Sequence, residues 1–237
     1  MPADATEMTP KRRAQLLRAW KGPARLFRKA LGRRLGAADA DAIGAEASRL
    51  YASLIDDIPL KLTFLAGARD ATYVYLAHYK VLAARGMSAP EIGELFGEAW
   101  DANPARKLPS WLPRLLVRPL LPLIRRKLKK DAELSQERRD PADFVYTYVE
   151  PDGDTDFGID VTDCAICRCF RRHDAEEIIP WLCALDDRMS DALGLGLRRS
   201  GTRALGHERC DFRYKLGGEP RPVEIRPLPV VETAERP

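Results

Sequence analysis

The chain of 237 residues has no cysteine in its first 163 residues, and it has no uncharged apolar run of about 18 residues, the length that a transmembrane helix needs. Its beginning has no apolar stretch followed by a small-residue cleavage site, which argues against a secretory signal. The five cysteines are an odd number, which argues against a disulfide framework. An apolar fraction of 45% beside a charged fraction of 31% is typical of a folded globular protein. The sequence therefore predicts a cytoplasmic protein.

Acidic residues are missing from two stretches of the chain. Residues 8–38 hold ten Lys and Arg and residues 102–130 hold nine, while neither stretch holds an Asp or a Glu. The net charge is only +4, so we expect no nucleic acid as a partner. The basic stretches fit either solvated helix faces or peripheral contact with an anionic membrane. Core packing and membrane contact explain equally well the apolar residues of the second stretch: Leu115, Leu116, Leu120, Leu121, Leu123 and Ile124.

The first 136 residues have the apolar periodicity of helices. Gly22-Pro23 can divide the first helix into two, and Gly36 is a stop signal. Ser88, with Glu91 three residues later, has the pattern of a capping box at a helix start. The predicted helices cover residues 10–35, 39–58, 68–86, about 88–100 and 111–136, the last being interrupted by prolines in its first part.

After about residue 140 the pattern changes to alternation with aromatic and β-branched residues, which indicates strands. Asp174 is a candidate cap for the second of two helices in this half, and Pro180 either kinks that helix or marks its start. The predicted strands cover residues 143–150, 156–161, 195–205 and 209–215, and the predicted helices cover residues 164–172 and 174–193.

The expected architecture is α+β, with a helical N-terminal half followed by a four-stranded antiparallel sheet subdomain that has two helices between its hairpins. We expect residues 1–38 to form a basic helical extension, residues 39–216 to form a single α+β domain, and residues 217–237 to form a Pro-rich tail.

All five cysteines lie between residues 164 and 210. Cys164, Cys183 and Cys210 fall on three different predicted elements that the fold can bring together. Asp186 shares a helix face with Cys183, because the two are three residues apart, and His207 precedes Cys210 in a turn. A thiolate at a helix start has a lowered pKa and can attack an electrophilic carbon. The same side chains also fit a thiolate-rich site for a divalent metal, and the sequence does not separate these two hypotheses.

Three segments carry the motifs of one known family. They read DVTDC at residues 160–164, CALD at residues 183–186 and GHERCDFR at residues 206–213. In this order and at these intervals they resemble the L-2-amino-thiazoline-4-carboxylic acid hydrolase family over about residues 144–214. Asp160 stands where members of the family usually have Asn, and Cys167 and Cys169 are additional.

The resemblance implies a hydrolase that opens a small cyclic amidine. Water adds to ring carbon 2 of the thiazoline-carboxylate and the ring sulfur leaves, which gives N-carbamoyl-L-cysteine. Cys164 or Cys210 would be the nucleophile or a metal ligand, and Asp186 would be the base or orienting group. His207 would carry protons, and Arg213 would bind the substrate carboxylate. The alternative is a non-catalytic domain of the same fold that binds a small ligand or a metal. The candidate catalytic residues are Cys164, Cys183, Asp186, His207, Cys210 and Asp211.

Overall fold

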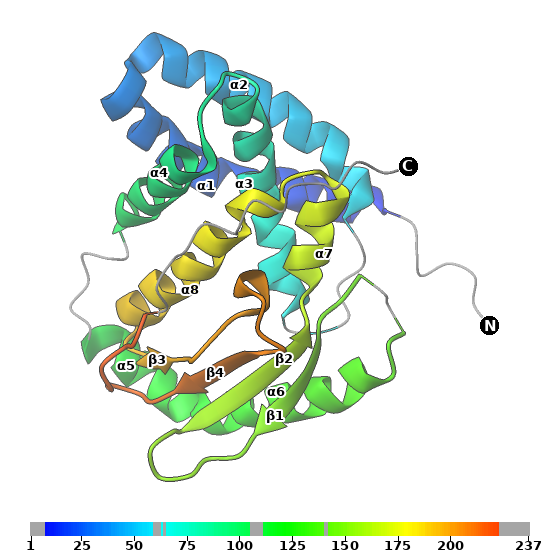
Figure 1. Ribbon diagram of the computed structural model, residues 1–237, viewed down its shortest axis with the longest axis vertical. Helices are drawn as coiled ribbons and strands as arrows, with labels where there is room; N and C mark the ends of the chain where they lie inside the picture. Colours follow the sequence, from blue (N-terminus) through cyan, green and yellow to red (C-terminus); the bar gives the residue numbers. More distant parts are fainter. Residues whose placement is uncertain (1–7, 59–62, 64, 105–110, 140–141, 223–237) are drawn as a thin grey trace.

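The computed structural model describes residues 8–58, 63, 65–104, 111–139 and 142–222. Figure 1 shows a group of helices at one end, the β-sheet toward the other end, and the helices labelled α7 and α8 between them. This arrangement confirms the predicted α+β class. The helices are α1 (Pro10–Leu35), α2 (Ala37–Leu54), α3 (Ala66–Ala83), α4 (Ala89–Asp101), α5 (Trp111–Val117), α6 (Leu121–Gln136), α7 (Ala165–Arg172) and α8 (Ile179–Leu193), and the strands are β1 (Val145–Val149), β2 (Phe157–Asp163), β3 (Leu197–Arg198) and β4 (Cys210–Tyr214).

Helix α1 runs through Pro23 without a break, so the predicted division at Gly22-Pro23 is wrong. Trp20 and Phe27, on either side of the proline, are buried in one core, and this packing holds both halves of the helix in place. The predicted stop at Gly36 is confirmed, because its φ of 91° is a conformation that residues other than glycine rarely adopt.

Of the helix starts predicted from local patterns, that of α4 is confirmed and that of α8 is confirmed only in part. The Ser88–Glu91 capping box is confirmed, with Ser88 N–H donating to Glu91 Oε2 at 2.8 Å. Helix α8 begins at Ile179 and carries Pro180 in its first turn, so the proline marks the start of the helix. Asp174 does not cap α8; it has a φ of 50° and lies five residues before the helix.

The sheet is antiparallel throughout and has the strand order β1-β2-β4-β3. The turn between β1 and β2 is held by Asp152 Oδ1, which accepts hydrogen bonds from the N–H and the hydroxyl of Thr155 at 2.8 and 2.9 Å. The predicted strand over residues 195–205 is too long. Only Leu197–Arg198 pair with β4, because the chain then enters a 3₁₀ turn at Arg203–Leu205.

The two faces of the sheet differ in polarity. Tyr146, Val161 and Cys210 lie opposite one another on three neighbouring strands and are buried, so they mark the inner face. Asp160 of β2 lies opposite Asp211 of β4, one residue before Val161 and one residue after Cys210. Because side chains alternate along a strand, these two carboxylates point to the outer face. The inner face packs against α6, the start of α7 and the residue before α3.

Helix α6 protects the edge of the sheet at β1. Ser135 Oγ accepts the backbone N–H of Tyr146 at 3.1 Å, and the side-chain amide of Gln136 donates to Tyr146 O at 2.8 Å. These contacts satisfy backbone groups that would otherwise be open to another strand.

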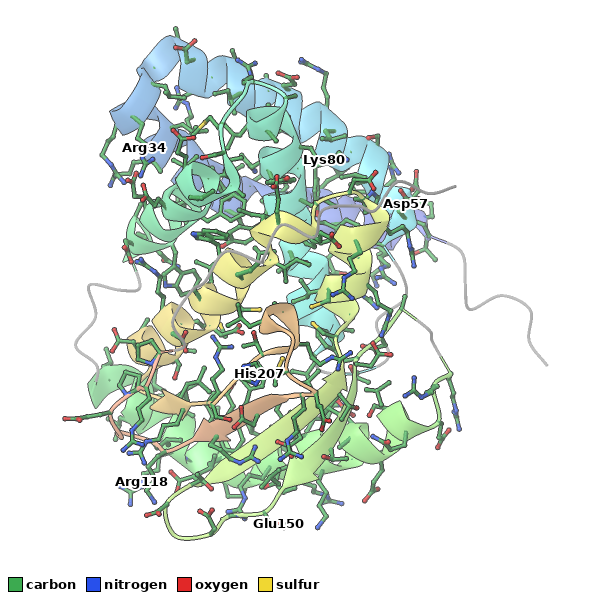
Figure 2. All side chains as sticks on the ribbon, viewed as in Figure 1. Arg34, Asp57, Lys80, Arg118, Glu150 and His207 are labelled. Carbon is green, nitrogen blue, oxygen red and sulfur yellow. The ribbon has the colours of Figure 1, made fainter. Side chains whose placement is uncertain are left out.

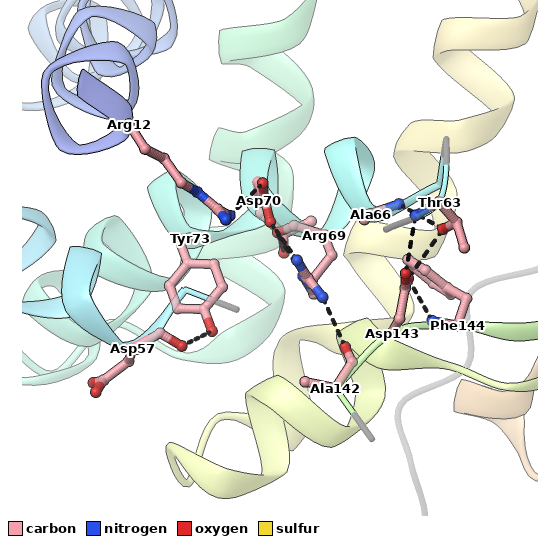
Figure 3. Close-up of polar contacts among 11 residues, drawn as sticks. Arg12, Asp57, Thr63, Ala66, Arg69, Asp70, Tyr73, Ala142, Asp143 and Phe144 are labelled. Carbon is pink, nitrogen blue, oxygen red and sulfur yellow. Dashed lines mark hydrogen bonds and ion pairs between the residues drawn. The ribbon is translucent and has the colours of Figure 1, made fainter. Parts of the chain in front are cut away.

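A buried polar network joins the helical group to the sheet (Figure 3). Arg69 of α3 is almost fully buried, and its guanidinium donates to Ala142 O at 3.0 Å while pairing with Asp70 at 2.9 Å. Just before β1, the Asp143 carboxylate accepts hydrogen bonds from the N–H and hydroxyl of Thr63 at 3.2 and 3.1 Å. Because buried polar groups are costly unless they are paired, this network fixes the start of β1 against α3.

The described parts of the predicted extension and tail contact the body of the protein. Phe27 and Leu31 of α1 are buried in the core of the helical group. Arg221 N–H donates to Leu197 O at 2.8 Å, which places the beginning of the tail beside β3, and residues 223–237 lie outside the described residues. Within the described ranges, no helix combines the length and the apolarity needed to cross a membrane.

Candidate functional site

Cys164 lies where strand β2 becomes helix α7. It is the residue that precedes the first turn of the helix, and its backbone is extended. Asp163, the last residue of β2, forms an ion pair with Arg168, which also donates to Asp143 O. These contacts fix the first turn of α7 against the ends of two strands. Cys164 and Ile166 contact both the core of the helical group and the core of the sheet, so the thiol lies at the junction of the two.

The surroundings of Cys164 favour its thiolate. Contact with the Cys167 thiol, together with the backbone N–H groups of Cys167 and Ile166, lowers the pKa of Cys164 despite burial and a nearby carboxylate. The Cys164 side chain makes no capping hydrogen bond at the helix start. The two N–H groups therefore act on the sulfur through their dipoles. The same contact with Cys164 raises the pKa of Cys167, as does burial. Cys167 therefore acts as a neutral donor to the Cys164 sulfur.

Asp186 on α8 lies within electrostatic reach of Cys164 and shares a helix face with Cys183, as its spacing predicted. Its side chain is 36% exposed, yet burial raises its pKa to about 6, with the Asp187 carboxylate adding to the rise and Arg199 opposing it. The Asp186 carboxylate is therefore reached by water although protein atoms largely surround it. Burial likewise raises the pKa of Cys183 and Tyr214, which are both only partly buried.

Arg199 pairs with both acidic residues of this part of α8, and no prediction from the sequence included it. Its guanidinium donates to Asp186 Oδ2 at 3.1 Å and to Asp187 Oδ2 at 2.9 Å, and it also donates to Cys183 O. It lies over the Phe212 ring, 5.2 Å from the centroid. Its side chain is almost fully buried. Nothing in the local pattern Arg198-Arg199 shows which of the two arginines turns inward, because that depends on the register of β3.

Cys210 completes the convergence that the sequence predicted. It lies on the inner face of β4, and its sulfur accepts the Arg203 N–H at 3.1 Å. Burial raises the pKa of Cys210 to about 12, against the opposing effect of that hydrogen bond. The charge of Asp186 affects the pKa of all three cysteines, Cys164, Cys183 and Cys210, so the fold brings the four residues together.

Three other predicted site residues lie apart from this cluster. Arg213 is on the outer face, where its guanidinium donates to Asp160 at 2.7 Å. Asp211 is also on the outer face and accepts hydrogen bonds from Ser200 N–H and hydroxyl at 2.9 and 2.7 Å. Burial opposes this, but the hydrogen bonds outweigh it and lower the pKa of Asp211. The carboxylate thus holds the loop after β3.

His207 lies in the turn that precedes β4 (Figure 2). Its side chain is exposed and makes no hydrogen bond or ion pair within the part of the chain that the structure describes. The ring lies over Gly201, where an added Cβ would be 2.4 Å from the imidazole. The structure therefore shows His207 closing the loop and does not show it in contact with the cysteines.

The described residues contain no preformed set of ligands for the metal that the sequence left open. Among the described residues, no group of three or more His, Cys, Asp or Glu side chains is arranged to hold a metal ion. The cysteines converge closely enough to affect one another's protonation, but not in the geometry of a coordination shell.

Comparison with known proteins gives one match. Residues 74–214 match the family model described as L-2-amino-thiazoline-4-carboxylic acid hydrolase. No curated protein and no solved structure matches the chain. The match extends the resemblance seen at residues 144–214 back into α3, so it includes most of the helices as well as the sheet. Because it covers more than half of the chain and every element that carries the cysteine cluster, the chain belongs to the L-2-amino-thiazoline-4-carboxylic acid hydrolase family.

Proposed function

We propose that this protein is a hydrolase that opens a small cyclic amidine of the thiazoline-carboxylate type, with Cys164 as nucleophile and Asp186 as acid and base. The observation that carries the proposal is the position of Cys164 at the start of α7, together with the contrast among the five thiols. The pKa of Cys164 is lowered, whereas the pKa values of Cys167, Cys169, Cys183 and Cys210 are all raised. A thiol with a lowered pKa beside a carboxyl group with a pKa of about 6 is suited to nucleophilic attack with proton transfer.

In the first step, the Cys164 thiolate forms a bond to ring carbon 2, and the bond from this carbon to the ring sulfur breaks. The leaving sulfur takes the proton of the Asp186 carboxylic acid and becomes a free thiol. The carbon is then held by Cys164 sulfur and by two nitrogens. Attack on an amidine carbon needs a good sulfur nucleophile and a proton for the leaving group, and these two residues supply both.

In the second step, water adds to the same carbon, and the bond to Cys164 sulfur breaks. One water proton goes to the amidine nitrogen and the other returns to Asp186, while Cys164 leaves as the thiolate. The product is the N-carbamoyl amino acid, and the sum is substrate plus one water. Both residues end in the protonation state in which they began, so the cycle needs no further reagent.

The other members of the cluster support these two residues. Arg199 positions Asp186 and limits the rise of its pKa. Cys183 and Cys210 have raised pKa values, so they are neutral thiols beside the reacting pair. Between the two nucleophiles left open by the sequence, this contrast favours Cys164 over Cys210.

The direct test is an assay for free thiol released from L-2-amino-thiazoline-4-carboxylate and related cyclic amidines. We expect Cys164→Ser to lower kcat/KM by at least about a hundredfold. The matched control is Cys169→Ala, on the same helix but buried in the core of the helical group, and it should retain the activity. Asp186→Asn should remove an inflection near pH 6 from the pH–rate profile.

Two results would overturn the proposal. Full activity of Cys164→Ser would show that this thiol is not the nucleophile. The absence of turnover with every cyclic amidine, combined with protection of Cys164 from alkylation by the same compounds, would identify the surroundings of Cys164 as a ligand-binding site without catalysis.

A further inference from the structure

Four leucines on the segment that joins the two halves of the chain are strongly exposed. Leu115, Leu116, Leu120 and Leu123 have 63%, 63%, 52% and 65% of their surface accessible, more than any other large apolar side chain among the described residues. The sequence left open whether these leucines belong to a core. The structure excludes this role for them.

Three of the exposed leucines lie along one side of this helical segment, and the fourth, Leu115, comes directly before Leu116. Helix α5, a 3₁₀ turn (Arg118–Leu120) and α6 follow one another without a gap. Leu116, Leu120 and Leu123 are spaced at i, i+4 and i+7, the interval that places side chains along one side of a helix. The residues of α6 that are buried lie further along the helix: Leu128, Asp131, Ala132 and Ser135.

Basic side chains flank these leucines. Residues 102–130 contain nine Lys and Arg and no acid. Lys127 pairs with Asp131 and Lys129 pairs with Glu150. Arg118, Arg126 and Lys130 are exposed and have no acidic partner within the described residues. Figure 2 shows Arg118 at the edge of the molecule, at the end opposite Arg34.

We propose that this leucine stripe, defined as Leu115, Leu116, Leu120 and Leu123, docks the protein on an anionic lipid surface. Apolar side chains next to unpaired cations match the two layers of such a surface, acyl chains and negatively charged headgroups. A second copy of the chain fits less well. In a symmetric dimer through this stripe, the same unpaired cations would face one another, and like charges across an interface are repulsive.

The test is flotation of the full chain with vesicles rich in phosphatidylglycerol and with vesicles of phosphatidylcholine alone. We expect binding to the anionic vesicles at low salt, weaker binding at high salt, and little binding to phosphatidylcholine. Leu116→Ser with Leu123→Ser should weaken the binding by at least about tenfold. Arg118→Gln with Arg126→Gln should weaken it severalfold for each charge removed.

The matched control is Leu17→Ser with Leu35→Ser, which removes two exposed leucines from the other basic helix, α1. This variant should bind vesicles as the unchanged protein does. Circular dichroism and sedimentation of each variant check the fold and the oligomeric state.

The proposal fails if the unchanged protein does not float with anionic vesicles, or if the α1 control loses binding as much as the stripe variant does. It also fails if the leucines mediate self-association, so that the stripe variant becomes monomeric while vesicle binding stays unchanged. Turnover of cyclic amidines in free solution is a separate measurement and does not bear on these outcomes.

Discussion

The helical group α1–α4 and the region from α7 to β4 each bury an ionisable side chain, and the two pKa values move in opposite directions. In the helical group, His78 lies between the rings of Trp20 and Phe27, and burial lowers its pKa to about 4. In the second region, burial raises the pKa of Asp186 to about 6. Burial disfavours the charged form in both places, so the histidine loses its proton and the carboxylic acid keeps it longer.

This difference separates His78, which supports packing, from Asp186, for which we propose a role in catalysis. His78 is buried, and its Nδ1 makes a 2.8 Å hydrogen bond with Val74 O inside its own helix. Asp186 is held by Arg199 and remains accessible to water beside a thiol with a lowered pKa. The region that we propose as functional is the one in which desolvation is combined with partial access to water and with an opposite charge.

The strongest way to disturb the functional region is to remove its buried cation. We expect Arg199→Met to lower the free energy of unfolding by about 3 kcal/mol or more, because Asp186 and Asp187 lose their partner. Chemical denaturation measures this effect. Arg198→Met is the control, since Arg198 is less buried and, among the described residues, its side chain makes only a 3.4 Å hydrogen bond to Glu219 O. Equal losses for the two variants would contradict the role given to Arg199.

The pH dependence of stability sharpens the comparison. His78 has a pKa of about 4 in the folded protein and 6.5 as its ordinary value, so the unfolded state takes up its proton first as the pH falls. Stability from this group is complete above about pH 6.5 and is lost by about 3 kcal/mol as the pH falls to about 4. Denaturation at several pH values should show the loss.

The variant that tests this assignment is His78→Leu, which should remove most of the loss. Asp186 works in the other direction, because its raised pKa costs stability as the pH rises from about 4 to about 6. In Asp186→Asn the fall in stability toward acid pH should therefore be steeper. An unchanged pH profile in His78→Leu would contradict the assignment.

The junction between the two regions depends on Gly93 of α4. A Cβ at this position would lie 1.9 Å from Cδ1 of Trp181 on α8, so the ring fits only against a glycine. We expect Gly93→Ala to lower the free energy of unfolding by about 1–3 kcal/mol through overpacking. Gly44→Ala in α2 meets nothing within 4 Å and should be neutral or slightly stabilising. A neutral result for Gly93→Ala would show that Trp181 moves freely.

The smallest expected effect concerns Cys167. Its thiol is the largest cause of the lowered pKa of Cys164, so Cys167→Ala should raise that pKa. We expect severalfold slower alkylation of Cys164 at neutral pH, because the thiolate is the reactive form. The rate is measured with iodoacetamide and mapped by mass spectrometry. Cys169→Ala should leave it unchanged, and an equal rate in Cys167→Ala would assign the effect to the helix dipoles alone.

Much of the fold follows from the sequence because its signals are local. The Ser88–Glu91 box, Pro180 and Gly36 mark helix ends through contacts within a few residues. Alternation predicted the strands, and the spacing of Cys183 and Asp186 predicted their shared face. The division of α1 at Pro23 and the long strand before β4 were wrong, because packing in one case and a 3₁₀ turn in the other prevailed over the local pattern.

The sequence by itself determined the α+β class, most helix and strand positions and the family motifs, and it led to the hypothesis that three cysteines and Asp186 converge. Only the tertiary structure decided that Arg199 turns inward, that Arg213 lies on the outer face, and that four leucines remain exposed. It also decided which thiol has a lowered pKa. The reason is physical: periodicity and capping act between near neighbours, whereas desolvation and charge pairing depend on residues that are distant in the chain and meet only in the folded protein.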